Sequence, residues 1–249
     1  MAEEIRGRDF AGAQVRDSTF NGASFRDSDL RGVTIRASWV EGMHVDGPHG
    51  EVQQVFVNGI DVSPYVTSEL DRLFPERVAV RSVSTAADRR TVWARLEGLW
   101  DETLERDSAV RDVSVGGEWS LRDTVRHLVF ADDCWTGQML LGGGPFHPWG
   151  LPNTDYPSDR VRADLGIDVS VDVPFDELVV LHRERRSRFG ALLAGLSDGD
   201  LATERTGTPA PACGEETHTV ADCIDTLLRE HSEHRRFIER DLRSLDEEA

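Results

Sequence analysis

Three potential metal ligands lie within five residues near the C-terminal end of the sequence: Glu230, His231 and His234. Apolar residues recur around them at spacings of three, four and seven. They are Val220, Ile224, Leu227, Ile238 and Leu245. This spacing predicts an amphipathic helix. His231 continues the apolar stripe, whereas His234 lies about 60° and Glu230 about 100° round the helix from it. All three face the interior or its edge, where a divalent metal would satisfy them.

His127 is a further candidate ligand, on a separate helical pattern. The residues at helical spacing from it are small or polar, which leaves room where a bundle core normally has Leu or Ile. They are Thr124, Ala131, Cys134 and Gln138. Alone, a histidine on such a face is more often a hydrogen-bonded core residue than a metal ligand. Together with Glu230 and His234 it supplies three nitrogen and oxygen ligands with one position open, which is typical of a catalytic site.

Four helix-length patterns carry these residues, at about 85–107, 120–141, 174–196 and 219–245. Long connections join them, so the sequence predicts a four-helix bundle, whose interior is a usual place for a metal site. The connection at about 142–173 holds three glycines and several prolines. A connection of that length in a compact domain is often functional.

Other polar residues have competing interpretations. His147 in the long connection is a candidate general acid or base, but its neighbours Phe146 and Pro148 would equally make it an anchor for the loop. Asp132 and Asp133 are adjacent on a helix, so they point about 100° apart and cannot both reach one site. The stretch from His182 through the following arginines, residues 182–188, is interpreted as a solvated or paired charged face.

The first 45 residues contain an internal repeat of five. Apolar residues occupy every fifth position, from Ile5 through Phe10 and Val15 to Val45, and most have a small residue two positions before them. This pattern resembles the pentapeptide-repeat family, which implies a right-handed quadrilateral β-helix of about two coils. We therefore expect an α+β multidomain chain, with a β-helix at 1–48, a connecting segment at 49–84 and a four-helix bundle at 85–249.

Composition excludes several classes of function. The formal charge of −18 disfavours nucleic-acid and anionic-membrane partners, which require positive surface. No apolar run is long enough to span a membrane, and the N-terminal residues lack the features of a signal peptide, so we expect a cytoplasmic protein. Cys134, Cys213 and Cys223 have no CxxC spacing, which favours reduced thiols.

The residues around the candidate ligands resemble a known superfamily. Residues 118–120 and 123–130 resemble the entry to the second helix of the DinB-like metalloproteins, and Glu230, His234 and the residues after them resemble the last helix of an actinobacterial branch. The connection at 146–152 is also similar to that branch. The resemblance covers roughly residues 55–245. It implies that His127, Glu230 and His234 hold a divalent metal, zinc or nickel, although His231 with His234 is an alternative helical pair.

The resemblance also implies an activity. Superfamily members whose activity is understood are transferases or isomerases that use a low-molecular-weight thiol such as mycothiol, and a metal would activate that thiol. We therefore expect a metal-dependent thiol S-transferase acting on an electrophilic small molecule, with a homodimer as a compatible assembly. Two other interpretations remain: a non-catalytic binding or scaffold protein with a degenerate bundle, and a metal-dependent hydrolase.

Overall fold

The computed structural model describes residues 5–26, 28–47, 52–106, 108–154 and 156–248. It divides into two compact units, Met1–Val45 and Asp46–Ala249. Three expectations concern residues outside the described ranges: the character of the first four residues, the boundary between 48 and 49, and the end of the first bundle helix at Asp107. No helix in the described ranges is both long enough and apolar enough to cross a membrane.

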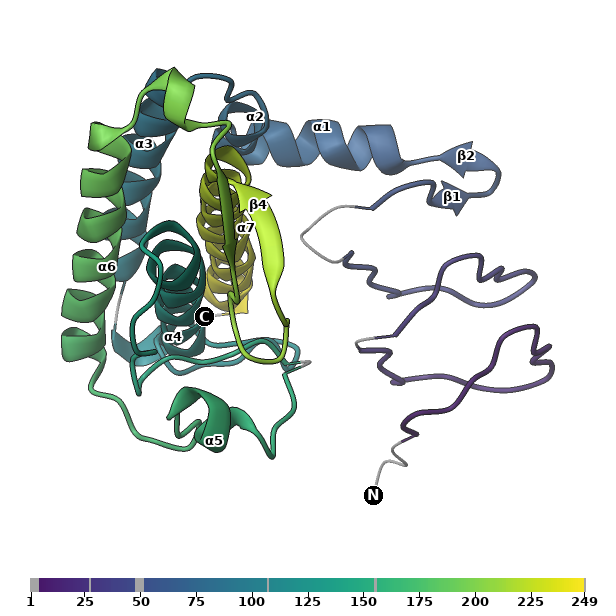
Figure 1. Cartoon of the computed structure of the whole chain (residues 1–249). Helices are drawn as coiled ribbons and strands as arrows, with labels where there is room; N and C mark the ends of the chain where they lie inside the picture. The colour runs from purple at the N-terminus through teal and green to yellow at the C-terminus, as the bar shows by residue number, and fades with distance from the viewer. Residues whose placement is uncertain (1–4, 27, 48–51, 107, 155, 249) are drawn as a thin grey trace. The chain divides into compact units, whose positions relative to one another are not determined.

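The N-terminal unit is built from regularly spaced turns. A backbone hydrogen bond closes a turn every ten residues, as from Ala13 to Phe10 and from Ala23 to Phe20. The described residues of this unit form no strand (Figure 1), so the structure does not show the expected closed β-helix. Its fivefold-spaced apolar side chains are 49% (Leu30) to 62% (Phe10) exposed.

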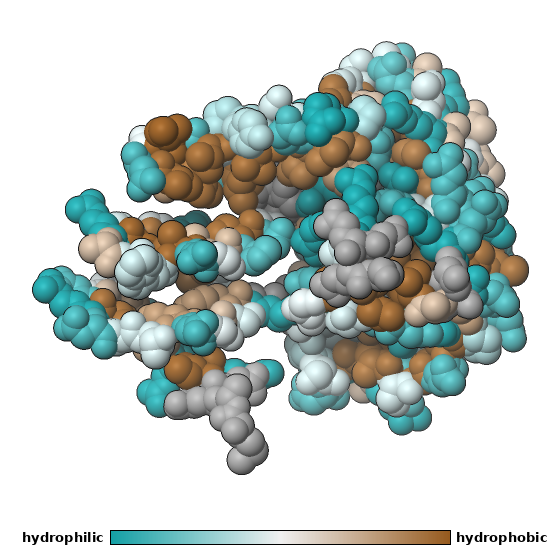
Figure 2. All heavy atoms as spheres, turned by 180° about the vertical axis from the view of Figure 1, so that it is seen from behind, coloured by the Kyte–Doolittle hydropathy of each residue, from teal (hydrophilic) through white to brown (hydrophobic). Residues whose placement is uncertain are grey.

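A hairpin and two helices begin the second unit. Strands β1 (Phe56–Val57) and β2 (Ile60–Asp61) pair in antiparallel fashion and lead into α1 (Ser63–Leu73). Brown, hydrophobic side chains gather over this hairpin and helix in Figure 2, in accord with the exposure of Phe56, Val57 and Ile60. The next helix, α2 (Glu76–Arg81), was not predicted, because residues 49–84 were expected to form only a connecting segment.

Four helices form the predicted bundle: α3 (Ala86–Leu104), α4 (Leu121–Asp132), α6 (Phe175–Gly195) and α7 (Val220–Glu248). Helices α3 and α4 each contact both α6 and α7, so the four enclose a common core (Figure 1). Trp93, Leu96 and Phe189 are among the fully or almost fully buried side chains of this core. Helix α2 packs against α3 and α7.

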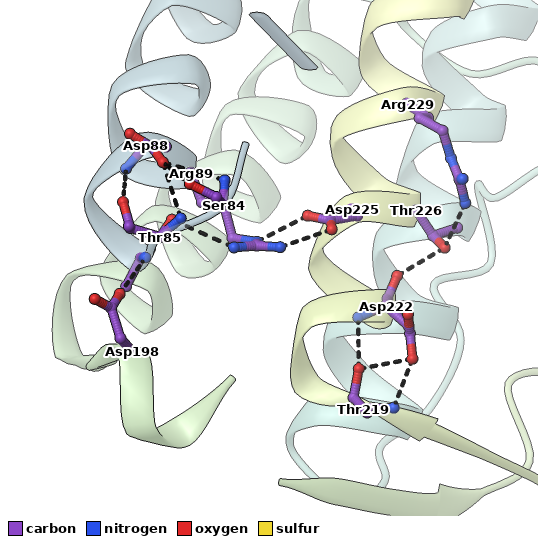
Figure 3. A network of polar contacts seen from close by, with 11 residues as sticks. Ser84, Thr85, Asp88, Arg89, Asp198, Thr219, Asp222, Asp225, Thr226 and Arg229 are labelled. Carbon is purple, nitrogen blue, oxygen red and sulfur yellow. Dashed lines mark hydrogen bonds and ion pairs between the residues drawn. The ribbon is translucent and has the colours of Figure 1, made fainter. Parts of the chain in front are cut away.

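Capping boxes start two of the bundle helices (Figure 3). Thr85 and Asp88 form one at the start of α3, and Thr219 and Asp222 exchange the same pair of hydrogen bonds at the start of α7. Each box satisfies backbone N–H groups that have no partner within the helix. Between these ends, Arg89 of α3 donates two hydrogen bonds, of 2.8 and 2.7 Å, to the carboxylate of Asp225 on α7.

Several elements differ from the sequence prediction. The predicted helix at 120–141 changes after Asp132 into a π-helix, η3 (Asp133–Leu140). The long connection contains a short helix, α5 (Val161–Leu165). Short 3-10 helices lie at Ser108–Val110 and Asp198–Asp200. An antiparallel hairpin, β3 (Glu204–Gly207) with β4 (Glu216–Thr219), precedes α7. No alternating apolar pattern marked either of these four-residue strands.

Candidate metal centre

His127, Glu230 and His234 form a compact group where α4 meets α7. One ligand atom from each lies within 4.8 Å of the other two. The Oε2 atom of Glu230 is 3.5 Å from Nε2 of His127 and 3.2 Å from Nε2 of His234. Two imidazoles from different helices therefore converge on one carboxylate.

The backbone geometry of α7 brings two of these ligands to one face. Glu230 and His234 are four residues apart, which places them on neighbouring turns of the same side. Helix α7 contacts α4 along this side, and His127 faces it from α4. The two helices run in opposite directions, because Leu121 at the start of α4 packs in the same cluster as Leu242 near the end of α7.

The long connection fixes the ring of His127. Its Nδ1–H donates to the backbone carbonyl of Leu151 at 3.0 Å, which directs Nε2 at the group. The adjacent Arg126 holds the same connection, because its guanidinium donates to the carbonyls of Trp149 and Val169. The backbone N–H of Leu151 in turn donates to the carbonyl of Arg126. The connection thus supplies the outer hydrogen bond that metal-binding histidines usually have.

The charges of the group suit a cation. Burial alone would raise the pKa of Glu230, but hydrogen bonds with His127 and His234 outweigh it and hold that pKa below its ordinary value. Burial lowers the pKa of His234, against the opposing effect of Glu230. At neutral pH Glu230 therefore presents a carboxylate and His234 a neutral imidazole, which are the ligand forms of these two side chains.

The group is open on one side. The side chain of His127 is 5% exposed, whereas those of Glu230 and His234 are 21% and 20% exposed. Imidazole and carboxylate donors of this number fit zinc or another divalent transition metal, with room for a further ligand from solvent. The donor set, its convergence and its outer hydrogen bond all agree with a metal site.

Trp119 covers part of the group, and sequence reasoning did not identify it as a site residue. Its ring lies 4.7 Å from that of His127 and 5.9 Å from that of His234, nearly parallel to the latter. Trp119 is half-buried and directly precedes Ser120, the N-cap of α4. The signal in the sequence was a large aromatic residue held next to a helix cap.

His231, the alternative ligand, lies elsewhere. It is fully buried, and its Nε2–H donates to Oδ2 of Asp132 at 3.3 Å rather than joining the three-residue group. Its carbonyl oxygen accepts a hydrogen bond of 3.0 Å from the indole of Trp100. The prediction that His231 sits centrally on the buried face was correct. That central position directs it to the bundle core, away from the edge where the ligands meet.

His147 is held within the long connection. Its backbone N–H donates to Asp133 at 2.8 Å, and its Nδ1 accepts from the N–H of Trp149 at 3.2 Å. Burial, followed by the nearby Arg185, lowers the pKa of His147. Asp133 also accepts from Arg185 at 2.8 Å. These contacts are those of a loop anchor. Asp132 and Asp133 indeed point to different partners, and neither belongs to the three-ligand group.

Residues 182–188 were expected to form a solvated or paired charged face. His182 departs from this expectation, because it is fully buried where α6 packs against α3 and α4. Arg186 is also buried but is paired, since its guanidinium donates to Asp101 at 2.7 Å. The ring of His182 stacks on that of His231, with centroids 5.6 Å apart. Cys134 is buried near the start of the π-helix.

Comparison with known families agrees with this geometry. The family model described as the DinB superfamily matches residues 85–238, which include the whole of α3, α4 and α6 and all three residues of the group. Comparison with curated proteins and with solved structures found no match. The match extends over more than half of the chain, and the bundle inside it carries the metal-ligand set. The chain therefore belongs to the DinB superfamily.

Proposed function

We propose that this protein is a metal-dependent thiol S-transferase, which joins a low-molecular-weight thiol of the mycothiol type to an electrophilic small molecule. The convergence of His127, Glu230 and His234, with two of the three partly exposed, carries the proposal. Three protein ligands with an open side are typical of catalytic metal sites, whereas structural sites are closed by four. Zinc or nickel is the proposed ion, because imidazole and carboxylate donors suit both.

The side chains prepare this chemistry before any substrate binds. A bound divalent ion supplies one effect, a lowered thiol pKa that provides thiolate at neutral pH. Glu230 carries the negative charge that balances the cation, and His127 is already held in the ligand tautomer by Leu151. The thiolate then forms a carbon–sulfur bond as the leaving group departs with its electron pair. The thiol proton leaves through the exposed side of Glu230 and His234.

A binding or scaffold function is the second candidate, supported by the N-terminal unit. The half-exposed apolar side chains of that unit form a surface that differs from the polar exterior of most soluble domains. We interpret the unit as a pentapeptide-repeat array, on the support of its fivefold spacing and its tenfold turn period. In both versions of the proposal the protein is cytoplasmic, and neither nucleic acid nor membrane is a partner.

Metal content is the first test. Purified protein is analysed for zinc, nickel and other divalent metals beside His127→Ala, Glu230→Gln and His234→Ala. We expect stoichiometric metal in the unaltered protein and a large loss in each variant. His218→Ala is the matched control, because His218 pairs with Glu216 on the β4 hairpin and is outside the group. Stoichiometric metal in both His127→Ala and His234→Ala would show that the ligands are misassigned.

Turnover is the second test. The metal-loaded protein is mixed with a thiol-reactive dye, with and without mycothiol. Conjugation that requires the thiol, the metal and His127 supports transfer. Dye hydrolysis without thiol would instead support the hydrolase. A metal-free protein that folds stably and is inactive would favour the scaffold function.

A further inference from the structure

Asp132 and His231 make a buried contact between the two helices that carry the metal ligands. Asp132 ends α4 and is 1% exposed, while His231 lies within α7 and is 0% exposed. Their side chains meet at 3.3 Å, between Nε2 of the imidazole and Oδ2 of the carboxylate. Sequence reasoning considered both residues for the metal site itself. The structure pairs them with each other.

Within the described residues, the surroundings leave this pair no other hydrogen-bond partner. The other polar atoms of the two side chains, Oδ1 of Asp132 and Nδ1 of His231, are buried without a partner. Rings enclose His231: Trp93 meets it edge-on at 4.8 Å, Trp100 edge-on at 6.3 Å, and His182 stacks on it. In such a dry environment a hydrogen bond is stronger than in water, and a lost partner is costly.

Asp132 and His231 each lie close to a metal ligand on the same helix. Asp132 follows His127 by five residues, about 7.5 Å along the axis of α4. His231 directly follows Glu230 and precedes His234 by three residues. The contact therefore lies between the same two helices as the ligands, one layer deeper in the bundle. The indole of Trp100 holds the backbone of α7 at the same point from α3.

We propose that Asp132 and His231 are positioning residues, whose contact sets the separation of α4 and α7 at the level of the metal group. Metal–nitrogen and metal–oxygen bonds of about 2.0–2.2 Å require ligands from two helices to be spaced within a few tenths of an ångström. Side chains at a helix–helix contact determine the distance between the axes. A directional contact beside the ligands therefore prepares their spacing for the ion. This inference rests on the metal-binding part of the proposed function.

Co²⁺ provides the test, because its visible absorption reports the geometry of its ligands while competition with a chelator reports affinity. Asp132→Leu replaces the carboxylate acceptor by a larger, apolar side chain. We expect about 10–100-fold weaker Co²⁺ binding and an altered spectrum. Asp132→Asn retains an acceptor oxygen for His231, and we expect affinity and spectrum close to those of the unaltered protein.

A double variant separates an effect on ligand positions from an effect on the stability of the fold. Asp132→Leu leaves the N–H of His231 unsatisfied, and Asp132→Leu with His231→Leu removes that penalty, so the double variant should recover stability. We expect its Co²⁺ affinity to stay low. Thr103→Val is the control, because it breaks a buried hydrogen bond of 2.6 Å from Thr103 of α3 to Glu239 of α7. It should lose stability and keep both affinity and spectrum.

The outcomes distinguish the two proposals. Unaltered affinity and spectrum in the single and double Leu variants would overturn the positioning role and leave the metal site intact. If Co²⁺ affinity falls together with the stability of the fold in every variant, including Thr103→Val, the positioning role is also overturned. Failure of the unaltered protein to bind Co²⁺, zinc or nickel would overturn the metal site together with this inference.

Discussion

The carbonyl oxygen of Leu151 lies 3.0 Å from Nδ1 of His127, so the 142–173 connection directly holds a candidate metal ligand. The hydrogen bond determines which ring nitrogen is protonated and how the ring is turned. The carbonyl is itself placed by Arg126, whose buried guanidinium binds the connection on both sides of it. The loop is therefore part of the metal centre as well as a cover for the bundle.

Replacing Arg126 should weaken metal binding without touching a ligand. Arg126→Met removes the donors to Trp149 and Val169, so the Leu151 carbonyl loses its fixed position. We expect roughly tenfold weaker metal binding and faster proteolysis of the connection. Arg162→Met is the control, because Arg162 pairs at the surface with Asp168 of the same connection at 3.7 Å. Equal metal affinity in both variants would argue against a role for the connection.

Replacing Trp119 should change the rate of metal exchange. Its ring lies against both histidines of the group, so Trp119→Ala exposes them to water and to chelators. We expect faster metal loss to a chelator, followed by stopped-flow absorbance. Trp119→Phe keeps an aromatic ring at this place and should exchange at a rate nearer that of the unaltered protein. A rate unchanged by both substitutions would show that Trp119 does not limit access.

The capping box of α7 should make stability fall in acid. Hydrogen bonds from Thr219 hold the pKa of Asp222 below its ordinary value. The contribution of ionised Asp222 to the free energy of unfolding is therefore complete above the pKa of Asp in the unfolded chain, about 3.9. It is lost as the pH falls through the lower pKa of the folded protein. Asp222→Asn should flatten the fall in the free energy of unfolding, measured with urea between pH 6 and pH 3. Thr219→Ala should cost about 1 kcal/mol at neutral pH.

Removing His182 should stabilise the bundle. Both ring nitrogens of this fully buried side chain lack a hydrogen-bond partner in the part of the chain that the structure describes. Burial lowers its pKa well below the ordinary value, so the folded protein binds fewer protons than the unfolded chain and loses stability as the pH falls below about 6.5. His182→Leu removes the unsatisfied atoms, and we expect a gain of about 1 kcal/mol that grows below that pH. A destabilised variant in urea unfolding would indicate that internal water satisfies the ring.

The bundle was predictable because its helices are long and periodic. The patterns at 85–107 and 219–245 appear as α3 and α7 with small shifts at their ends. The matched superfamily agrees with the expected fold of this part. The four-residue strands β3 and β4 were not predictable, because their pairing depends on each other rather than on a local pattern.

The site was partly predictable for a related reason. Helical spacing placed Glu230 and His234 on one side of α7, but spacing alone gave His231 the more central position. Which residue meets His127 depends on where α4 crosses α7, and one sequence does not contain that information. The burial of His182 was missed for the same cause, since an arginine-rich stretch does not show which of its faces meets a neighbouring helix.

Helix α7 is 29 residues long, about 44 Å, and contacts α2, α3, α4, η3 and β4. Its amide protons thus exchange with solvent mainly when the second unit opens as a whole, since few can be exposed by a local fluctuation. An ion held near the middle of this helix would slow amide exchange along most of its length. Deuterium uptake along α7 would then serve as a record of metal occupancy at a distance from the ligands.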